Sequence, residues 1–416
     1  GLLEPIRSLM VSEANPFDRM SLYEKMTAGG SALLLDGEVG GGLRKRVPES
    51  DRALVPASVL FDDPSVVRDL HLDYISAGAQ IITTNTYATV RQRLDDLLGK
   101  GDRWEEAMTT ACEMAQLARA DSGKDVLIAG SLPPLHGSYR PDKVGASEDI
   151  LPVYREHVAI MAKYVDLFLC ETMSTGLEAW AAVSAAKESG KPVWVSWNLQ
   201  DDGSGCLRNG ETLQHAWEMV ADLRPEAALV NCNAPETITA AMPVLASLGA
   251  GFVGAYGNGF VAIPEGWTTQ STGISALGKR YDLTPHAYAA MALQWTEVGA
   301  RIIGGCCEVG AAHIAVLRQH LERAGKIPAS LTDKEHSSLH GKEDWLAVND
   351  FSISSISSVE CLRLNSSSHA SVATATSVAS CNTLDAIAFK KCDHCSGRTL
   401  DTVMFEKSAM CENCEA

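Results

Sequence analysis

The feature that most constrains this chain is a regular alternation of short apolar runs with longer segments that carry apolar residues at helical spacing. Eight such runs lie between residues 30 and 330. Runs that are apolar at nearly every position are typical of parallel strands buried on both faces. The pattern therefore predicts strands at residues 32–36, 80–84, 126–130, 167–171, 193–198, 228–232, 252–256 and 301–305.

The segments between the runs predict helices. Clear examples are residues 63–78, 176–190, 234–249 and 284–299, each of which ends on the glycine that often closes a helix. Eight β/α units in about 300 residues predict a (β/α)8 TIM barrel at residues 30–328, after an N-terminal extension of residues 1–29. A doubly wound open sheet is the structural alternative, which periodicity alone does not exclude.

Charge and hydropathy narrow the classes of partner. The sequence contains 35 Lys and Arg residues and 52 Asp and Glu residues, which gives a formal net charge of -17. A negative charge is unfavourable for binding nucleic acid or anionic lipid. No apolar run approaches the roughly 18 uncharged residues of a membrane-spanning helix. We therefore expect small-molecule substrates, no nucleic acid and no membrane, and the sequence leaves the oligomeric state open.

Three cysteines fall where a barrel places its chemistry, at the C-terminal ends of the strands. Cys232 ends the sixth predicted strand, and Cys306 and Cys307 follow the eighth. Three protein ligands leave one tetrahedral position open, as in catalytic zinc sites, and thiolates favour Zn2+ over Mg2+ or Mn2+. A substrate thiol in the open position would lose its proton and become a nucleophile.

At these motifs the sequence resembles the homocysteine S-methyltransferase family, over roughly residues 30–325. The similarity rests on DG at 36–37, TNTY at 84–87, CET at 170–172 with EA at 178–179, VNC at 230–232 and IIGGCC at 302–307. The resemblance implies a zinc-dependent TIM barrel that methylates homocysteine to methionine.

The resemblance also implies roles for individual residues. The residues that would bind the catalytic zinc ion are Cys232, Cys306 and Cys307. The residues that would bind homocysteine are Asp36 and Glu171, at its ammonium group, and Gly37 and Thr84, at its carboxylate. Glu38 departs from the family pattern, which has a small residue there, and its carboxylate would repel that of the substrate unless it points outward.

The methyl donor is expected to be a sulfonium compound, with S-methylmethionine as the first candidate because its positive charge already activates the methyl group. Betaine is the alternative donor. A zinc-dependent barrel hydrolase is less favoured, because such sites use His and carboxylate ligands and no His cluster lies at the predicted strand ends. A non-catalytic zinc or redox-sensing adaptor that acts through the C-terminal cysteines is a further alternative.

The C-terminal region differs from the barrel in composition. Residues 329–385 are rich in Ser without a helical or alternating pattern, which predicts a mostly irregular linker. Residues 386–416 contain two CxxC pairs with the spacing of a structural zinc knuckle, formed by Cys392, Cys395, Cys411 and Cys414. An unstructured tail is the alternative. Cysteines in these patterns indicate metal ligands rather than disulfides, so we expect a reducing, cytoplasmic compartment.

The remaining cysteines and the strand tryptophans predict packing rather than chemistry. Cys112, Cys170 and Cys206 are expected to be packing residues, and alternation along its strand points Cys170 away from the mouth. Trp194 and Trp197 could form an aromatic face for a cationic donor, but core packing is the favoured interpretation.

Overall fold

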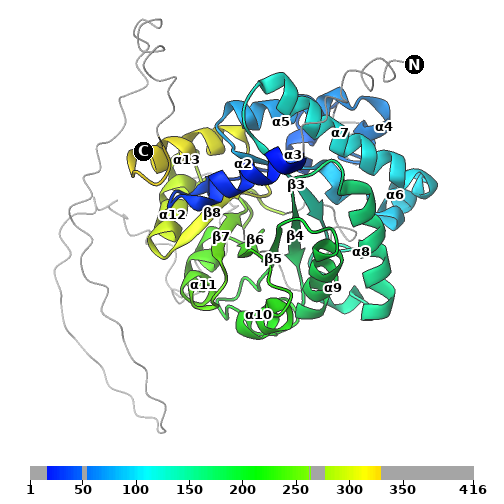
Figure 1. The fold of residues 1–416 in the computed structure, drawn as a ribbon. Helices are drawn as coiled ribbons and strands as arrows, with labels where there is room; N and C mark the ends of the chain where they lie inside the picture. Colours follow the sequence, from blue (N-terminus) through cyan, green and yellow to red (C-terminus); the bar gives the residue numbers. More distant parts are fainter. Residues whose placement is uncertain (1–15, 49–53, 262, 264–276, 329–416) are drawn as a thin grey trace, which may run out of the picture. The chain divides into compact units, whose positions relative to one another are not determined.

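The computed structural model describes residues 16–48, 54–261, 263 and 277–328. Eight parallel strands form one sheet in the order β1-β8-β7-β6-β5-β4-β3-β2, and helices surround it (Figure 1). The sheet closes between β1 and β2, where Leu35 forms a parallel bridge with Ile81 and the Asp36 N–H donates to the Ile81 carbonyl at 3.0 Å. The predicted TIM barrel is confirmed, because the strand order lacks the reversal of a doubly wound sheet.

The strands lie within two residues of the predicted runs at each end. Their bounds are β1 Leu33–Leu34, β2 Ile81–Thr83, β3 Leu127–Leu132, β4 Leu167–Met173, β5 Val193–Trp197, β6 Ala227–Asn231, β7 Phe252–Gly257 and β8 Ala300–Gly305. Nearly every strand residue is buried, because one face fills the barrel and the other lies under the helices.

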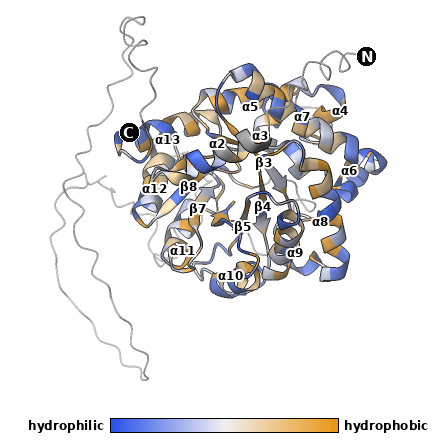
Figure 2. Ribbon diagram, in the orientation of Figure 1, coloured by the Kyte–Doolittle hydropathy of each residue, from blue (hydrophilic) through white to orange (hydrophobic). Residues whose placement is uncertain are grey.

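The main helices follow the strands along the chain. They are α5 Ser65–Ser76, α7 Trp104–Ser122, α8 Ser147–Met161, α9 Gly176–Lys187, α10 Leu213–Ala221, α11 Pro235–Ser247, α12 Pro285–Glu297 and α13 Ala311–Arg323. Shorter helices are α3 Val39–Arg44, α4 Val59–Asp62 and α6 Arg91–Leu98, with 3-10 turns η2 Asn85–Ala88, η3 Gly101–Arg103 and η4 Pro141–Lys143. Figure 2 shows hydrophilic residues gathered on the outer sides of helices such as α6.

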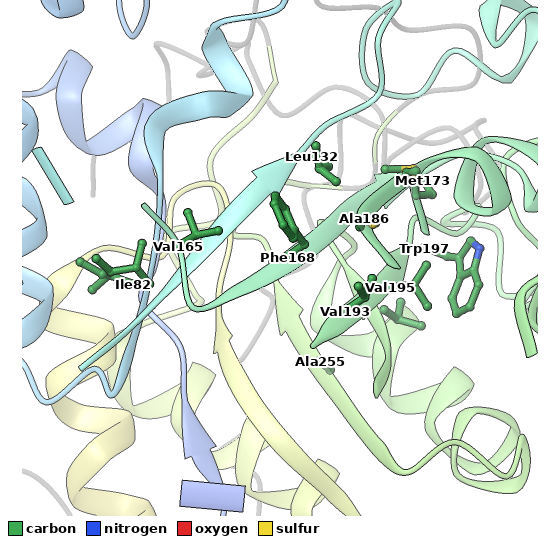
Figure 3. Packing of buried hydrophobic residues seen from close by; sticks show 14 of the residues in the cluster. Ile82, Leu132, Val165, Phe168, Met173, Ala186, Val193, Val195, Trp197 and Ala255 are labelled. Atoms are coloured by element: carbon green, nitrogen blue, oxygen red, sulfur yellow. The ribbon is translucent and has the colours of Figure 1, made fainter. Parts of the chain in front are cut away.

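The hydrophobic core has two layers that follow the alternation along each strand. On β4, Leu167 and Leu169 belong to the layer inside the barrel, whereas Phe168 and Cys170 belong to the layer beneath the helices. Figure 3 shows part of the outer layer, which includes Phe168, Val195 and Trp197. Cys170 therefore faces away from the mouth, as predicted.

The helix α2 Pro16–Ala28 lies within the predicted N-terminal extension and packs against the barrel interior. It contributes Tyr23, whose hydroxyl accepts a hydrogen bond from the Trp194 Nε1 at 3.1 Å. Arg301 of β8 donates to the carbonyl of Thr27 at 3.2 Å, near the end of the helix. Trp194 is thus a core residue that closes the barrel interior, and it takes no part in the mouth.

Two further expectations concern regions beyond the barrel. The predicted Ser-rich linker at 329–385 and the predicted zinc knuckle at 386–416 lie outside the described residues. Within the described part of the chain, no helix has both the length and the apolar character that crossing a membrane requires.

The contact between α2 and the barrel interior yields a stability prediction. Tyr23→Phe leaves the buried Trp194 N–H without its acceptor, so the free energy of unfolding should fall by about 1–2 kcal/mol in urea denaturation. Tyr281→Phe is the matched control, because the Tyr281 side chain is 86% exposed. Equal stability of the Tyr23→Phe protein and the wild type would show that this hydrogen bond does not hold α2.

Candidate metal and amino-acid site

Three cysteine thiols meet at the C-terminal end of the barrel. Cys232 follows β6, and Cys306 and Cys307 follow β8. Their sulfur atoms all lie within 4.8 Å of one another, and the Cys232 and Cys307 Sγ atoms are 3.7 Å apart. The structure thus brings together the three residues that the sequence predicted as metal ligands, in a cluster that could hold a metal ion.

The backbone around Cys232 is held in an unusual conformation. Its φ of 56° lies in the left-handed region, which is unfavourable for a residue with a side chain. Three hydrogen bonds fix it: the Cys232 N–H donates to the Tyr256 carbonyl at 3.1 Å, and its carbonyl accepts from Asn198 Nδ2 at 2.9 Å and Asn258 Nδ2 at 2.8 Å. The direction of the Cys232 thiol is therefore set by buried polar groups of three different segments.

The backbone at the end of β7 and just after it positions the other two thiols. The Cys306 N–H donates to the Gly257 carbonyl, and the Cys307 carbonyl accepts from the Gly259 N–H, both at 2.8 Å. Gly305 cannot be replaced without movement, because a Cβ there would lie 2.2 Å from Val309 Cγ1. The glycine before the two cysteines is thus explained by close packing.

Hydrogen bonds among the three thiols shift their pKa values in opposite directions. The pKa of the Cys232 thiol is held well below its usual value, because Cys306, Cys307 and Tyr139 donate hydrogen bonds to its thiolate. The pKa values of Cys306 and Cys307 lie well above the usual value, because both donate to Cys232 and both are partly removed from water. A divalent cation at this cluster would favour loss of all three protons.

Tyr139 contacts the cluster directly and was missed by the sequence analysis. Its hydroxyl lies 3.0 Å from Cys232 Sγ, and its φ of 62° is left-handed. It comes from the long segment between β3 and α8, where the sequence carries no periodic pattern that would place a side chain at the mouth. No sequence signal identified it.

One pocket contains the thiols and the predicted amino-acid ligands. The residues from the prediction that line it are Asp36, Gly37, Thr84, Glu171, Cys232, Cys306 and Cys307. They come from the ends of five different strands, which only the closed barrel brings together. The pocket therefore combines a metal-binding wall with a second wall of buried carboxylates.

The two carboxylates are both buried and both hydrogen-bonded. Asp36 accepts from the Thr83 N–H at 2.7 Å and from the Thr83 hydroxyl at 2.9 Å. Glu171 accepts from the Ser131 hydroxyl and, at 3.2 Å, from the Tyr256 hydroxyl. Burial raises the pKa of Asp36 to about 8 and that of Glu171 to about 7, and the charge of Glu171 adds to the effect on Asp36. An ammonium group between them would restore both negative charges.

Thr84 and Gly37 line the pocket in different ways. The Thr86 hydroxyl donates its proton to the Ser131 carbonyl, so in the 2.7 Å contact between the two threonines Thr84 is the donor. A substrate carboxylate would have to replace Thr86 as the acceptor of that proton. At Gly37 a Cβ would lie 2.1 Å from the Val309 carbonyl oxygen, so only glycine fits.

Glu38 does not point outward, in contrast to the condition set by the sequence analysis. Its carboxylate is buried, forms an ion pair with Lys45, and accepts from the Glu308 N–H at 2.8 Å. A Cβ on Gly41 would lie 1.9 Å from Glu38 Oε2, so this glycine makes room for the carboxylate. The positive charge of Lys45 offsets the repulsion that Glu38 would otherwise exert on an anionic substrate.

Comparison with known proteins relates this site to characterised enzymes. The family model described as Homocysteine S-methyltransferase matches residues 33–321. The homocysteine S-methyltransferase of Escherichia coli strain K12 is 31% identical, with 69% of this chain and 94% of the relative covered. A relative from Pongo abelii, the S-methylmethionine--homocysteine S-methyltransferase BHMT2, is 26% identical, with 77% of this chain and 87% of the relative covered.

A solved structure agrees with the fold. The metallated form of the homocysteine methyltransferase MmuM from Escherichia coli superposes with a TM-score of 0.60 at 27% sequence identity. The match covers 72% of this chain and 99% of MmuM. Similarity thus extends over the whole barrel.

The raised pKa of Glu171 yields a prediction about stability and pH. The folded metal-free protein retains this proton up to about pH 7, whereas the unfolded chain releases it near the ordinary value of 4.5. The stabilisation is therefore complete below pH 4.5 and is lost as the pH rises through 7. Relative to Glu171→Gln, which keeps a neutral side chain, the wild type should lose about 2 kcal/mol of unfolding free energy between pH 5 and 7.5.

Urea denaturation of both metal-free proteins at the two pH values measures this difference. Glu218→Gln, at an exposed position on α10, is a control that should behave like the wild type. A constant difference between wild type and Glu171→Gln across this range would contradict the raised pKa.

Proposed function

The chain belongs to the homocysteine S-methyltransferase family, and we propose that it transfers a methyl group from S-methylmethionine to the sulfur of homocysteine. The homocysteine thiol loses its proton, and both the methylated acceptor and the demethylated donor become methionine. The observation that carries the proposal is a single pocket in which three thiols face two buried carboxylates. The thiols suit a metal that binds the substrate sulfur, and the carboxylates suit an ammonium group. A small amino acid with a thiol side chain presents both groups at once.

The donor set fits zinc. Three sulfur ligands within 4.8 Å of one another, at the wall of an accessible pocket, leave a coordination position for the substrate. Zn2+ bound by Cys232, Cys306 and Cys307 would act as a Lewis acid that lowers the pKa of the homocysteine thiol. The Tyr139 hydroxyl, at 3.0 Å from Cys232 Sγ, would hold the direction of that ligand by a hydrogen bond.

Residues of the chain fix the substrate for attack. Asp36 and Glu171 bind the ammonium group, and both become ionised as it enters between them. Gly37 and Thr84 lie beside the substrate carboxylate. With its ammonium group and its sulfur both held, homocysteine has little freedom left, and in-line approach to the donor methyl group is favoured by orientation.

The pocket also suits a cationic donor. Aromatic side chains that line it are Tyr87, Tyr139, Tyr256 and Phe260. Aromatic rings can stabilise a sulfonium or a quaternary ammonium group, so both S-methylmethionine and betaine are compatible with this lining. The relative from Pongo abelii, which carries S-methylmethionine in its name, supports the first of these donors.

We also propose where the activity resides and under which conditions it operates. Residues 30–328 contain the complete barrel and its pocket, so they form the catalytic domain. Three adjacent thiols in the free state need reducing conditions, which favours the cytoplasm.

A donor panel tests the proposed function. The full-length, zinc-loaded protein is incubated with homocysteine and, separately, S-methylmethionine, betaine, S-adenosylmethionine or methyltetrahydrofolate, and methionine is quantified. Turnover should be fastest with S-methylmethionine, after correction for the second methionine that this donor itself becomes. Faster turnover with betaine would assign the alternative donor, and absence of methionine with every donor would overturn methyl transfer to homocysteine.

Loss of one thiol tests the metal site. Cys306→Ser should lower bound zinc by one ion per chain, and it should reduce turnover by more than the roughly 100-fold that loss of an outer-sphere partner causes. Zinc is measured by atomic absorption on reduced protein. Cys206→Ser is the matched control, because Cys206 lies outside the cluster. Unchanged zinc content and turnover in Cys306→Ser would show that the cluster is not the catalytic metal site.

A further inference from the structure

The pocket has a positively charged part that the binding of homocysteine does not use. Arg44, the last residue of α3, and Arg93, in the first turn of α6, both line it. Among the described residues, neither guanidinium has a carboxylate partner or a hydrogen-bond acceptor. Two arginines thus line the same pocket as the thiols, and no acceptor in the described part of the chain uses their donors.

Arginines in other parts of the barrel differ from Arg44 and Arg93, because they pair with carboxylates. Arg119 is largely buried and pairs with Asp166 at 2.7 Å, and Arg208, also largely buried, pairs with Asp201 at 3.2 Å. Such pairing is expected, because a guanidinium removed from water without a counter-charge is strongly unfavourable. Within residues 16–48, 54–261, 263 and 277–328, no carboxylate pairs with Arg44 or Arg93 as one does with Arg119 and Arg208.

The surroundings of Arg93 reinforce the point. Burial lowers the pKa of its guanidinium, and the ionisable groups that act on it are Tyr87 and Arg44. No carboxylate is among them. Two like charges in a partly buried position are unfavourable together, and an anion between them would stabilise both.

The charged part is continuous with the reaction centre. Tyr87 is near enough to Arg93, Glu171 and Cys232 for each of them to influence the pKa of its hydroxyl. Arg93 therefore faces the same space as the thiols and carboxylates, with Tyr87 as their common neighbour. A molecule bound beside Tyr87 can contact Arg93 while its reactive group approaches the metal site.

We propose that Arg44 and Arg93 form an anion subsite that binds the carboxylate of the methyl donor. Planar guanidinium groups bind carboxylates through paired N–H donors, which gives direction as well as charge. The inference rests on the proposed function, in which homocysteine occupies the thiols, Asp36 and Glu171. The class of methyl donor becomes narrower. The donor carries both a methylated cation and a carboxylate, whereas a simple sulfonium or ammonium ion is excluded.

The subsite is tested with Arg93→Met in the full-length, zinc-loaded protein. The probes are S-methylmethionine and its decarboxylated analogue, (3-aminopropyl)dimethylsulfonium. In the variant, KM for S-methylmethionine should rise at least about tenfold, whereas KM for homocysteine should stay within about twofold. The kcat/KM for the analogue should not fall in the variant, because the analogue has no carboxylate to lose contact with and its positive charges are repelled by Arg93.

Two further variants sharpen the test. Arg93→Lys keeps the charge and should recover part of the affinity for S-methylmethionine. Arg91→Met is the matched control on the same helix, because Arg91 is exposed and pairs with Glu156 at 3.5 Å. It should leave both KM values unchanged, and thermal unfolding verifies that all variants fold.

Several results would overturn the subsite. An unchanged KM for S-methylmethionine in Arg93→Met would exclude it, and a rise in KM for homocysteine alone would assign the arginines to the carboxylate of that substrate. Calorimetric binding of S-methylmethionine gives a readout that needs no turnover. A wild-type protein that forms no methionine but binds S-methylmethionine through Arg93 would refute the proposed function while retaining the subsite.

Discussion

The hydrogen bonds of β7 to its two neighbours are the constraint on which the site depends. β7 carries no metal ligand itself, yet its carbonyls at Tyr256 and Gly257 accept from the N–H groups of Cys232 and Cys306. The pairing of β7 with β8 shifts between Val253 and Gly254, where a Cβ would lie 2.4 Å from the Ile302 carbonyl oxygen. The strand that holds the N–H groups of Cys232 and Cys306 is thus packed closely against β8. Small changes here would move two ligands relative to the third.

Sequence analysis predicted those parts of the site that the strands carry. Continuous apolar runs mark buried parallel strands, so the residues at their ends could be placed at the mouth without a structure. Tyr139 and Ser131 could not be predicted. The contribution of Tyr139 depends on the path of a loop, and that of Ser131 depends on a contact with the neighbouring strand. Arg44 and Arg93 could not be predicted for another reason. Charged residues in short helices are usually solvated, and only their position at the pocket distinguishes these two arginines from surface arginines.

The structure also corrects a simple interpretation of Glu38. From sequence, an additional carboxylate beside the substrate is unfavourable unless it faces solvent. In the barrel it is buried, and Lys45 and the Glu308 N–H neutralise it locally. Gly41 provides the space. The spacing of residues in the sequence could not reveal these two contacts. Lys45 follows the short helix that begins after Glu38, and Glu308 comes from the far end of the barrel domain.

The pocket contains groups of both charges, although the net charge of the chain is strongly negative. Overall the protein is strongly acidic, but the pocket joins an acidic part at Asp36 and Glu171 to a basic part at Arg44 and Arg93. Each part is unfavourable by itself: burial raises the pKa values of the two carboxylates, and the two guanidinium groups have no carboxylate partner among the described residues. The ammonium group of homocysteine would relieve the first cost, and the carboxylate of the methyl donor would relieve the second. Because these interactions would form in a partly desolvated space, the acidic part would discriminate against acceptors without an ammonium group, and the basic part against donors without a carboxylate.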